Sequence, residues 1–288
     1  MKKILFLALA VFFSLITNAQ APAGDAIKIR WATFNIRCVS GDDYKINCGW
    51  EQRKELVARY LTDNEIDICG MQEVTDAQMT YLRKNLRGYG SVGVGRTDGK
   101  RKGEATPVFY RKDRFKALDK GNFWLSETPD VVGSKGWDAA LERIASWVKL
   151  KDKKTGRVFM AVNTHFDHVG KVARRESAKL IMRKIQEIVG SDPAVVTGDF
   201  NVSESDEAYK TMVSNEFQMN DAYHMTDNNT GATYTYHDYC RIPAEKAHKI
   251  DFIFITPSIR VSRTHIEQPE NKAPQLSDHN PHYADLEF

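Results

Sequence analysis

The stretch AVVTGDFN, residues 194–201, is a short apolar segment that ends in an acid and an amide. Val suits a buried strand and a carboxylate does not, so an acid at the end of such a strand indicates a functional site. We predict a strand from Ala194 to Asp199. Side chains two residues apart leave the same face of an extended chain, so Asp199 and Asn201 should lie side by side. This pair suits a phosphate group together with a cation.

The same arrangement recurs along the chain. Polar side chains end or follow other apolar segments: Asn35 in TFNIR, Glu73 in GMQEV, His165 in NTHFDH, Asp251 in KIDFIF, and Asp278 with His279 in SDHNP. Independent accidents would not place so many acids, amides and histidines at strand ends. The pattern therefore indicates one shared site with a catalytic composition.

Strand-like and helix-like segments alternate over the rest of the chain, without an internal repeat or a linker-like change in composition. Hydrophobic periodicity predicts strands at 27–35, 65–73, 108–111, 145–150, 157–165, 194–199, 250–256 and 282–288, and helices at 50–62, 76–86 and 171–189. The first of these helices has its predicted apolar stripe at Leu56, Val57, Tyr60 and Leu61. The KDKKTG turn makes its two flanking strands antiparallel. One domain of mixed sheets covered by helices is expected.

The first twenty residues have the composition of an export signal. Lys2 and Lys3 precede an apolar run from Ile4 to Ile16, and small residues follow it. The run is too short to span a bilayer, and no later stretch approaches the length that a membrane helix needs. We expect a signal peptide at 1–20, cleaved near Ala19 and Gln20, and a single domain at 21–288. The mature protein would be periplasmic or secreted.

Composition narrows the class of protein further. The chain has 288 residues, of which 42% are hydrophobic and 27% are charged, and a formal charge of +3. This balance is typical of a globular enzyme and excludes a strongly basic protein that coats nucleic acid. Four cysteines without a CxxC motif indicate neither a disulfide scaffold nor zinc. Cys38 and Cys48 could form a bridge, with Cys240 as a rival partner.

The residue types favour metal-assisted phosphate chemistry. Asn35 and Glu73 add an amide and a carboxylate from two other strand ends, and such oxygen ligands select Mg²⁺ or Mn²⁺ over zinc. His279 follows Asp278, an acid that could hold the imidazole in one tautomer so that it activates water. His165 needs an acid from elsewhere, and Glu104 is the candidate. Asn163, Asp167 and His168 surround His165 in sequence and favour a functional role for this segment.

In this order and across nearly the whole mature chain, the motifs TFNIR, QEV, NTHFDH, GDFN, KIDFIF and SDHNP resemble those of the endonuclease/exonuclease/phosphatase superfamily. That group contains DNase I, abasic-site endonucleases, sphingomyelinases, deadenylases and inositol-polyphosphate 5-phosphatases. The resemblance implies an α+β fold, a DNase I-like sandwich of two packed mixed, largely antiparallel β-sheets flanked by helices. It places the site at one edge of the sandwich and implies Mg²⁺-dependent hydrolysis of a phosphoester.

The resemblance also implies roles for individual residues. The resemblance implies that Asn35 and Glu73 are metal ligands. It adds Asp251 to this metal-binding group, as the acid that precedes the Asp278–His279 pair in the sequence. The catalytic set implied by the motifs is His165, Asp199, Asn201, Asp278 and His279. Glu104 resembles the acid that supports His165.

Substrate contacts are expected from the loops between the motifs. Arg96 in GRTDGKRKGE and Arg174 after NTHFDHVG could meet phosphate, as could Asp167 indirectly, although charges on a hairpin tip or a helix often only solvate a face. We expect a monomeric phosphodiesterase dependent on Mg²⁺ or Mn²⁺, acting on nucleic acid, a phospholipid headgroup or a sugar phosphate. The alternatives are a phosphomonoesterase of the same superfamily and an inactive exported protein that binds phosphate ligands.

Overall fold

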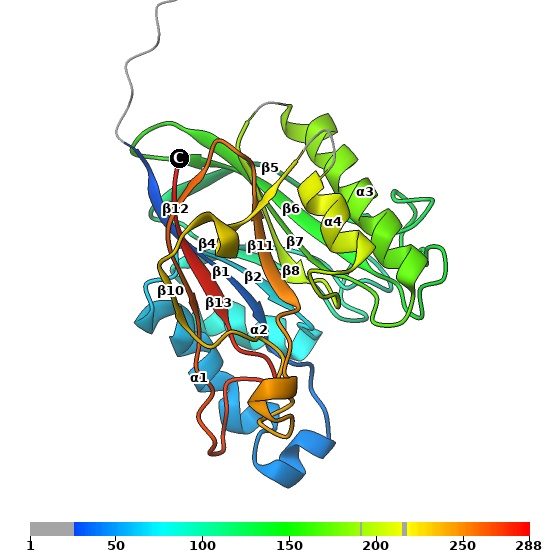
Figure 1. Cartoon of the computed structure of the whole chain (residues 1–288), viewed down its shortest axis with the longest axis vertical. Coiled ribbons are helices and arrows are strands. Elements are labelled where there is room, and N and C mark those ends of the chain that lie inside the picture. Colours follow the sequence, from blue (N-terminus) through cyan, green and yellow to red (C-terminus); the bar gives the residue numbers. More distant parts are fainter. Residues whose placement is uncertain (1–25, 191, 215–217) are drawn as a thin grey trace, which may run out of the picture.

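The computed structural model describes residues 26–190, 192–214 and 218–288 (Figure 1). The signal peptide expected at 1–20 lies outside these residues. Within the described part of the chain, no helix combines the length and the apolar character that crossing a membrane requires.

Two packed β-sheets form the centre of the molecule (Figure 1). The seven-stranded sheet has the order β10-β12-β13-β1-β2-β4-β3, and the six-stranded sheet has the order β5-β6-β7-β8-β11-β9. Among the described strands, the β1/β2, β7/β8 and β10/β12 pairs are parallel and the other neighbours are antiparallel. The expected fold of two mixed, largely antiparallel sheets is confirmed. The strand bounds are β1 (Lys28–Asn35), β2 (Ile68–Gln72), β3 (Tyr89–Val92), β4 (Val108–Arg111), β5 (Phe115–Trp124), β6 (Ile144–Asp152), β7 (Val158–His165), β8 (Ala194–Asp199), β9 (Asn220–Asp221), β10 (Asn229–Gly231), β11 (Asp251–Ile255), β12 (Arg260–Ile266) and β13 (His282–Glu287).

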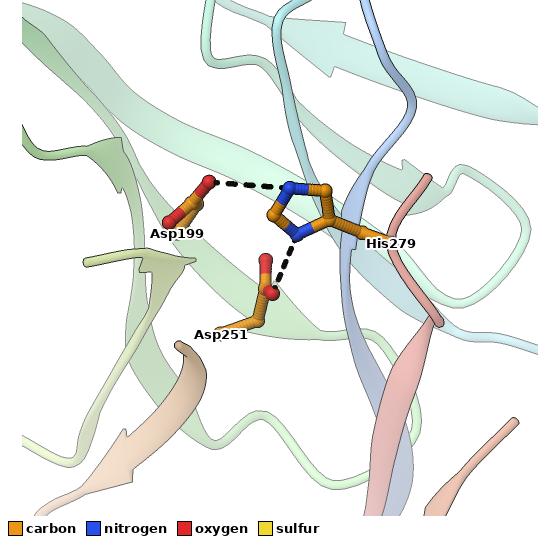
Figure 2. A group of neighbouring side chains, drawn as sticks. All are labelled: Asp199, Asp251 and His279. Carbon is orange, nitrogen blue, oxygen red and sulfur yellow. Dashed lines mark hydrogen bonds and ion pairs between the residues drawn. The ribbon is translucent and has the colours of Figure 1, made fainter. Parts of the chain in front are cut away.

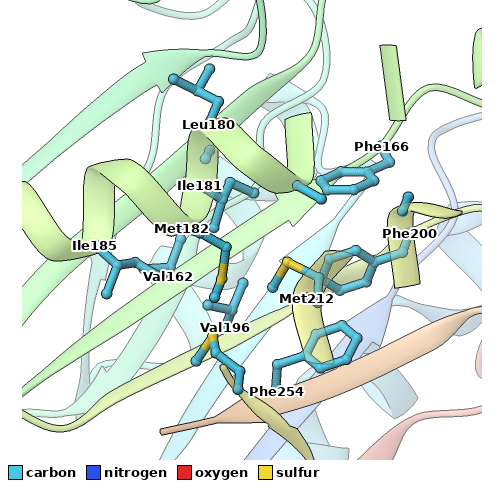
Figure 3. Packing of buried hydrophobic residues seen from close by; sticks show 14 of the residues in the cluster. Val162, Phe166, Leu180, Ile181, Met182, Ile185, Val196, Phe200, Met212 and Phe254 are labelled. Carbon is cyan, nitrogen blue, oxygen red and sulfur yellow. The ribbon is translucent and has the colours of Figure 1, made fainter. Parts of the chain in front are cut away.

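Helices cover the outer face of each sheet. The helix bounds are α1 (Trp50–Asp63), α2 (Asp76–Asn85), α3 (Lys171–Val189) and α4 (Glu207–Ser214), with short 3-10 turns η1 (Asp42–Ile46), η2 (Ala222–Met225) and η3 (Ala244–Lys246). Helices α1 and α2 pack on the seven-stranded sheet, and α3 and α4 on the six-stranded sheet. Figure 3 shows the second contact, where Ile181 and Ile185 of α3 meet Val162 and Val196 of the sheet.

Strand β1 shows how alternation divides the core. Ile29 and Trp31 point between the two sheets, whereas Ala32 and Phe34 pack under α1 and α2. A strand presents alternate residues to opposite faces, so Asn35 shares the inward face and points between the sheets at their edge. The apolar residues that precede Asn35 therefore set the direction of its side chain.

A buried polar cluster ties the two sheets together near this edge. The Asn163 amide on β7 donates to the carbonyl oxygens of Met71 and Pro107, at 2.6 and 3.1 Å. Its oxygen accepts from Gln72 at 2.7 Å and from Thr197 at 3.1 Å. Asn163 was expected to favour catalysis, but its side chain is fully buried in these structural bonds. A Cβ on Gly70 would collide with this cluster, which explains a glycine in the middle of a strand.

Several expectations are corrected by the structure. Strands β3, β5, β9, β10 and β12 and helix α4 were not predicted, because β5 and β12 contain charged residues that interrupt their apolar pattern and the others are short. In α1, Val57, Tyr60 and Leu61 are buried as expected, but Leu56 is 37% exposed. All four cysteines lie in the described residues and are free, so neither proposed bridge involving Cys38 or Cys240 is present.

Candidate active site

Strand direction brings the site together. The parallel pairs β1/β2 and β7/β8 end at the same edge of the sandwich, and the antiparallel strands β11 and β13 begin there. On the central strands, Asp199 is the register partner of His165 on one side and of Asp251 on the other. Residues far apart in sequence are therefore adjacent because the strands carrying them are neighbours.

His279 is held between two acids (Figure 2). Its Nδ1–H donates to Asp251 Oδ2 at 2.8 Å, and its Nε2 lies 3.8 Å from Asp199 Oδ2. All three side chains are buried. Burial alone would lower the pKa of His279, but the negative charge and hydrogen bond of Asp251, with help from Asp199 and Asp278, raise it to about 10. Before any ligand binds, the ring is an imidazolium whose Nε2 faces Asp199.

Asp278 does not hold the neighbouring histidine, contrary to expectation. Its Oδ1 accepts from Ser277 Oγ at 3.1 Å, and its Oδ2 lies 3.7 Å from Arg37 Nη1. The acid next to His279 in sequence therefore contacts Ser277 and Arg37 and makes no hydrogen bond with the imidazole. Burial raises the pKa of Asp278, as Glu73 does, while His279 opposes the rise.

Asp199 is the buried centre of the site. Its pKa is raised to about 7 by burial and by the adjacent Asp251, against the opposing effect of His279. Asn35 Nδ2 donates to Asp199 Oδ2 at 3.0 Å, and the Asn201 backbone amide donates to Oδ1 at 2.9 Å. A carboxyl with this pKa exchanges a proton near neutral pH.

The backbone conformation of Asn201 differs from the extended one that was expected. Its φ of 49° places it in the left-handed region, so the chain turns after Asp199 and is not extended. Its side-chain amide donates to the Phe166 carbonyl oxygen at 3.0 Å, which orients the remaining amide oxygen. The prediction that Asp199 and Asn201 leave one strand face is wrong, because the strand ends at Asp199.

Asn35 links a second carboxylate to this centre. Its Nδ2 also donates to Glu73 Oε1 at 3.1 Å, and the Cys38 amide donates to Glu73 Oε2 at 2.9 Å. Burial would raise the pKa of Glu73, but the Cys38 amide, the charge of His279 and the Asn35 amide outweigh burial and lower it. Glu73 is therefore ionised at neutral pH. It offers anionic oxygens of the kind that Mg²⁺ and Mn²⁺ bind.

The donor set fits a divalent cation. Ligand atoms of Asp199, Asp251 and His279 lie within 4.8 Å of one another, and Glu73 is joined to Asp199 through Asn35. Asp251 Oδ1 is buried and has no hydrogen-bond partner within the described residues. The pKa of Asp199 is raised because it is buried next to another acid, Asp251. A bound cation would reduce the repulsion between these two carboxylates. Glu73 and Asp199 or Asp251 are the residues that could hold it. Asn35 Nδ2 donates to Glu73 and Asp199 and its Oδ1 accepts from the Arg37 amide, so in this arrangement Asn35 orients the carboxylates.

His165 lies on the other side of Asp199, with 3.5 Å between its Nε2 and Asp199 Oδ2. Burial, followed by the charges of Arg143 and Arg96, lowers the pKa of His165 well below its usual value, so its ring is neutral. Its Nδ1 has no hydrogen-bond partner in the described part of the chain. The expected support from Glu104 is absent, because Glu104 Oε2 pairs with Arg96 Nη1 at 2.7 Å.

Three predicted substrate contacts have other partners. Arg96 is buried and pairs with Glu104. Asp167 accepts from the Val169 and Gly170 amides at 2.9 and 2.8 Å, which fixes the loop before α3. Arg174 is buried and donates to the Asp167 carbonyl oxygen at 3.0 Å.

Two residues beside the site were missed from the sequence. Arg143 is 4% exposed and directly precedes β6, which pairs antiparallel with β7. The ring of Tyr236 lies 4.9 Å from that of His279. The sequence does offer a signal for Arg143. This residue directly precedes the apolar strand β6, and the start of β6 pairs with the end of β7, which carries His165. Tyr236 lies outside any strand, and its sequence offers no comparable signal.

Comparisons with known proteins agree with the fold. A solved endonuclease/exonuclease/phosphatase from Bacteroides vulgatus is 54% identical, with a TM-score of 0.88, covering 91% of this chain and 99% of that one. A solved mannosyl-6-phosphatase from Bacteroides thetaiotaomicron is 39% identical, with a TM-score of 0.84, covering 90% of this chain and 100% of that one.

Among curated proteins, human Nocturnin is 25% identical over 84% of this chain. The match covers 58% of Nocturnin, and as little as 32% of the Drosophila melanogaster Nocturnin, so the chain spans only part of the length of these relatives. The model of the Endonuclease/Exonuclease/phosphatase family matches residues 32–279, which include every predicted catalytic and metal-binding residue. The chain therefore belongs to the endonuclease/exonuclease/phosphatase family.

Proposed function

We propose that this protein is a metal-dependent hydrolase that removes the phosphate from a sugar phosphomonoester. The observation that carries hydrolysis is the His279 ring, fixed by Asp251 and facing Asp199 in a buried polar site. The monoester and sugar assignments are supported by the 39% identity to the mannosyl-6-phosphatase, which is matched over its whole length.

The residues divide the chemistry as follows. A divalent cation held by Glu73, whose carboxylate Asn35 orients, would neutralise phosphoryl and leaving-group oxygens. Asp199, oriented by the Asn35 side chain and the Asn201 backbone amide, accepts the proton of the attacking water. His279, with its pKa of about 10, presents Nε2–H to the charge that develops on the phosphoryl group. The neutral ring of His165 and the second Nδ2 hydrogen of Asn201 contact the remaining phosphoryl oxygens.

Export is part of the proposal. The leader expected at 1–20 supports an enzyme that acts in the periplasm or outside the cell. Its monomeric state is a separate part of the proposal. The N-terminal sequence of the mature protein, purified from the organism's extracellular or periplasmic fraction, tests the cleavage site. Light scattering tests the oligomeric state.

The activity is tested with matched chromogenic esters. Release of p-nitrophenol from p-nitrophenyl phosphate and from bis-p-nitrophenyl phosphate, and of phosphate from mannose 6-phosphate, would be measured with Mg²⁺, Mn²⁺ or EDTA. We expect metal-dependent turnover of both monoesters. His279→Ala should abolish turnover in a protein that circular dichroism shows to be folded, whereas His224→Ala, at an exposed histidine paired with Glu204, should retain turnover. A His279→Ala variant with wild-type turnover would refute the proposed site.

Phosphodiester hydrolysis is the second candidate. It is favoured by the 25% identity to the rat protein named Tyrosyl-DNA phosphodiesterase 2, which extends over 81% of this chain. Faster turnover of the bis ester than of the monoester would select this candidate. Phosphate binding without turnover of any ester would select the inactive binding protein.

A further inference from the structure

Arg143 occupies a position beside the site that the proposed chemistry does not use. It lies two residues before Ala145, whose register partner on β7 is Thr164, so it adjoins the strand end that carries His165. Its side chain is 4% exposed. Such burial of a guanidinium requires compensating partners, because the charged group has lost its water.

The partners of Arg143 account for two of its three nitrogens. Nη2 donates to His168 Nδ1 at 3.0 Å, and Nε lies 3.4 Å from Asp167 Oδ2. Asp167 already accepts from three backbone amides, those of Leu141, Val169 and Gly170. Arg143 Nη1 is buried and has no hydrogen-bond partner in the part of the chain that the structure describes.

The charged groups around this open nitrogen belong to the site. Arg143 interacts electrostatically with Arg96, Glu104 and Asp199, and both arginines act on His165. Glu104 is paired with Arg96 at 2.7 Å. His165 Nδ1 is a second buried polar atom without a partner. Each guanidinium is thus paired with one carboxylate, but Arg143 Nη1 is still a buried cationic donor without a partner, and an anionic oxygen could bind it.

We propose that Arg143 selects a terminal phosphate. Its Nη1 binds a phosphate oxygen that is free in a phosphomonoester and bonded to a second organic group in a phosphodiester. The inference rests on the proposed phosphomonoesterase function and names how that site distinguishes its substrate. A phosphomonoester near neutral pH carries close to two negative charges and a diester carries one, so a buried guanidinium discriminates between them. Glu104 limits the positive charge of the same space through Arg96.

The test compares kcat/KM for p-nitrophenyl phosphate with kcat/KM for bis-p-nitrophenyl phosphate. In Arg143→Gln we expect the monoester value to fall roughly 10- to 100-fold, since one charge-assisted hydrogen bond is lost, and the diester value to change about threefold or less. Arg143→Lys keeps the charge without the planar fork and should give an intermediate ratio. Glu104→Gln should shift the ratio towards the monoester. Arg175→Gln, at an exposed arginine paired with Glu176, is the matched control.

A pH profile separates charge recognition from a structural role. The monoester loses its second charge below about pH 6, so the wild-type preference for it should decline there, whereas the Arg143→Gln ratio should be nearly independent of pH. Equal loss of both substrates in Arg143→Gln, with a wild-type ratio in Arg143→Lys and Glu104→Gln, would overturn the inference.

A binding measurement distinguishes this inference from the proposed function. With Mg²⁺ present, inorganic phosphate should raise the melting temperature of the wild type and of Arg175→Gln, but not that of Arg143→Gln. If the wild type hydrolyses only the diester, the phosphomonoesterase function fails. The role of Arg143 in binding a terminal phosphate is then tested by the rise in melting temperature that phosphate causes. An equal rise in Arg143→Gln and in the wild type would refute that role.

Discussion

Replacing Asp251 by Asn is the sharpest test of how the site is organised. The substitution removes the charge that faces His279 Nδ1 at 2.8 Å and keeps an oxygen that can accept the hydrogen bond. Asp251 lies at the start of β11 and is 1% exposed, so solvent screens the interaction little. The change therefore isolates the electrostatic part of the contact.

The magnitude follows from the pKa of His279. Although burial would lower it, Asp251 foremost among the neighbouring acids raises it to about 10 from the ordinary 6.5. A difference of this size favours the imidazolium by about 4–5 kcal/mol, of which about 2–3 kcal/mol is a reasonable share for Asp251. Because the pKa is raised on folding, this stability is fully present below pH 6.5 and is lost as pH rises through 10. The variant should therefore be most destabilised in mildly acidic solution.

Urea unfolding in EDTA at intervals from pH 5.5 to pH 10 measures this dependence. We expect Asp251→Asn to lose about 2–3 kcal/mol at the acidic end and progressively less towards the alkaline end. Asp285→Asn breaks a more exposed pair with Arg30 and should cost under about 1 kcal/mol throughout. A destabilisation of Asp251→Asn that is absent at pH 6, or that grows with pH, would refute the proposed pairing.

Three further predictions concern the cation and the core. Glu73→Gln should raise the Mg²⁺ concentration needed for half-maximal activity by about tenfold or more, measured by metal titration, and an unchanged requirement would exclude Glu73 as a ligand. Burial and Asp251 raise the pKa of Asp199 to about 7, so its ionisation destabilises the metal-free protein increasingly as pH rises towards 7. The increase in melting temperature caused by Mg²⁺ should therefore be larger at pH 8 than at pH 6. A larger increase at pH 6 would contradict this. Asn163→Ala should cost about 3 kcal/mol in urea unfolding, because buried partners lose their hydrogen bonds, whereas Ala at the exposed Asn85 should cost under about 0.5 kcal/mol; equal costs would exclude the bridging role of Asn163.

The long periodic segments could be predicted from sequence because burial on one face imposes a regular spacing. Helix α3 begins and ends where its apolar stripe predicts, and β8 has the predicted bounds. Strands β5 and β12 could not be found in this way, because polar and charged residues interrupt both strands and leave no regular apolar spacing. Leu56 was misplaced because a helix buries only about a third to half of its circumference, and Val57, Tyr60 and Leu61 already fill that stripe.

The partners of the site residues could be predicted only in part. Sequence alone determined that Asn35, Glu73, His165, Asp199, Asp251 and His279 stand at strand ends, because acids, amides and histidines interrupt apolar runs there. Tertiary structure decided that Asp251 and not the adjacent Asp278 holds His279, that Glu104 pairs with Arg96, and that Arg143 joins the site. Spacing along the chain fixes which face of a strand a side chain leaves. Strand order and register fix what it meets, and these follow from packing the whole chain into two sheets.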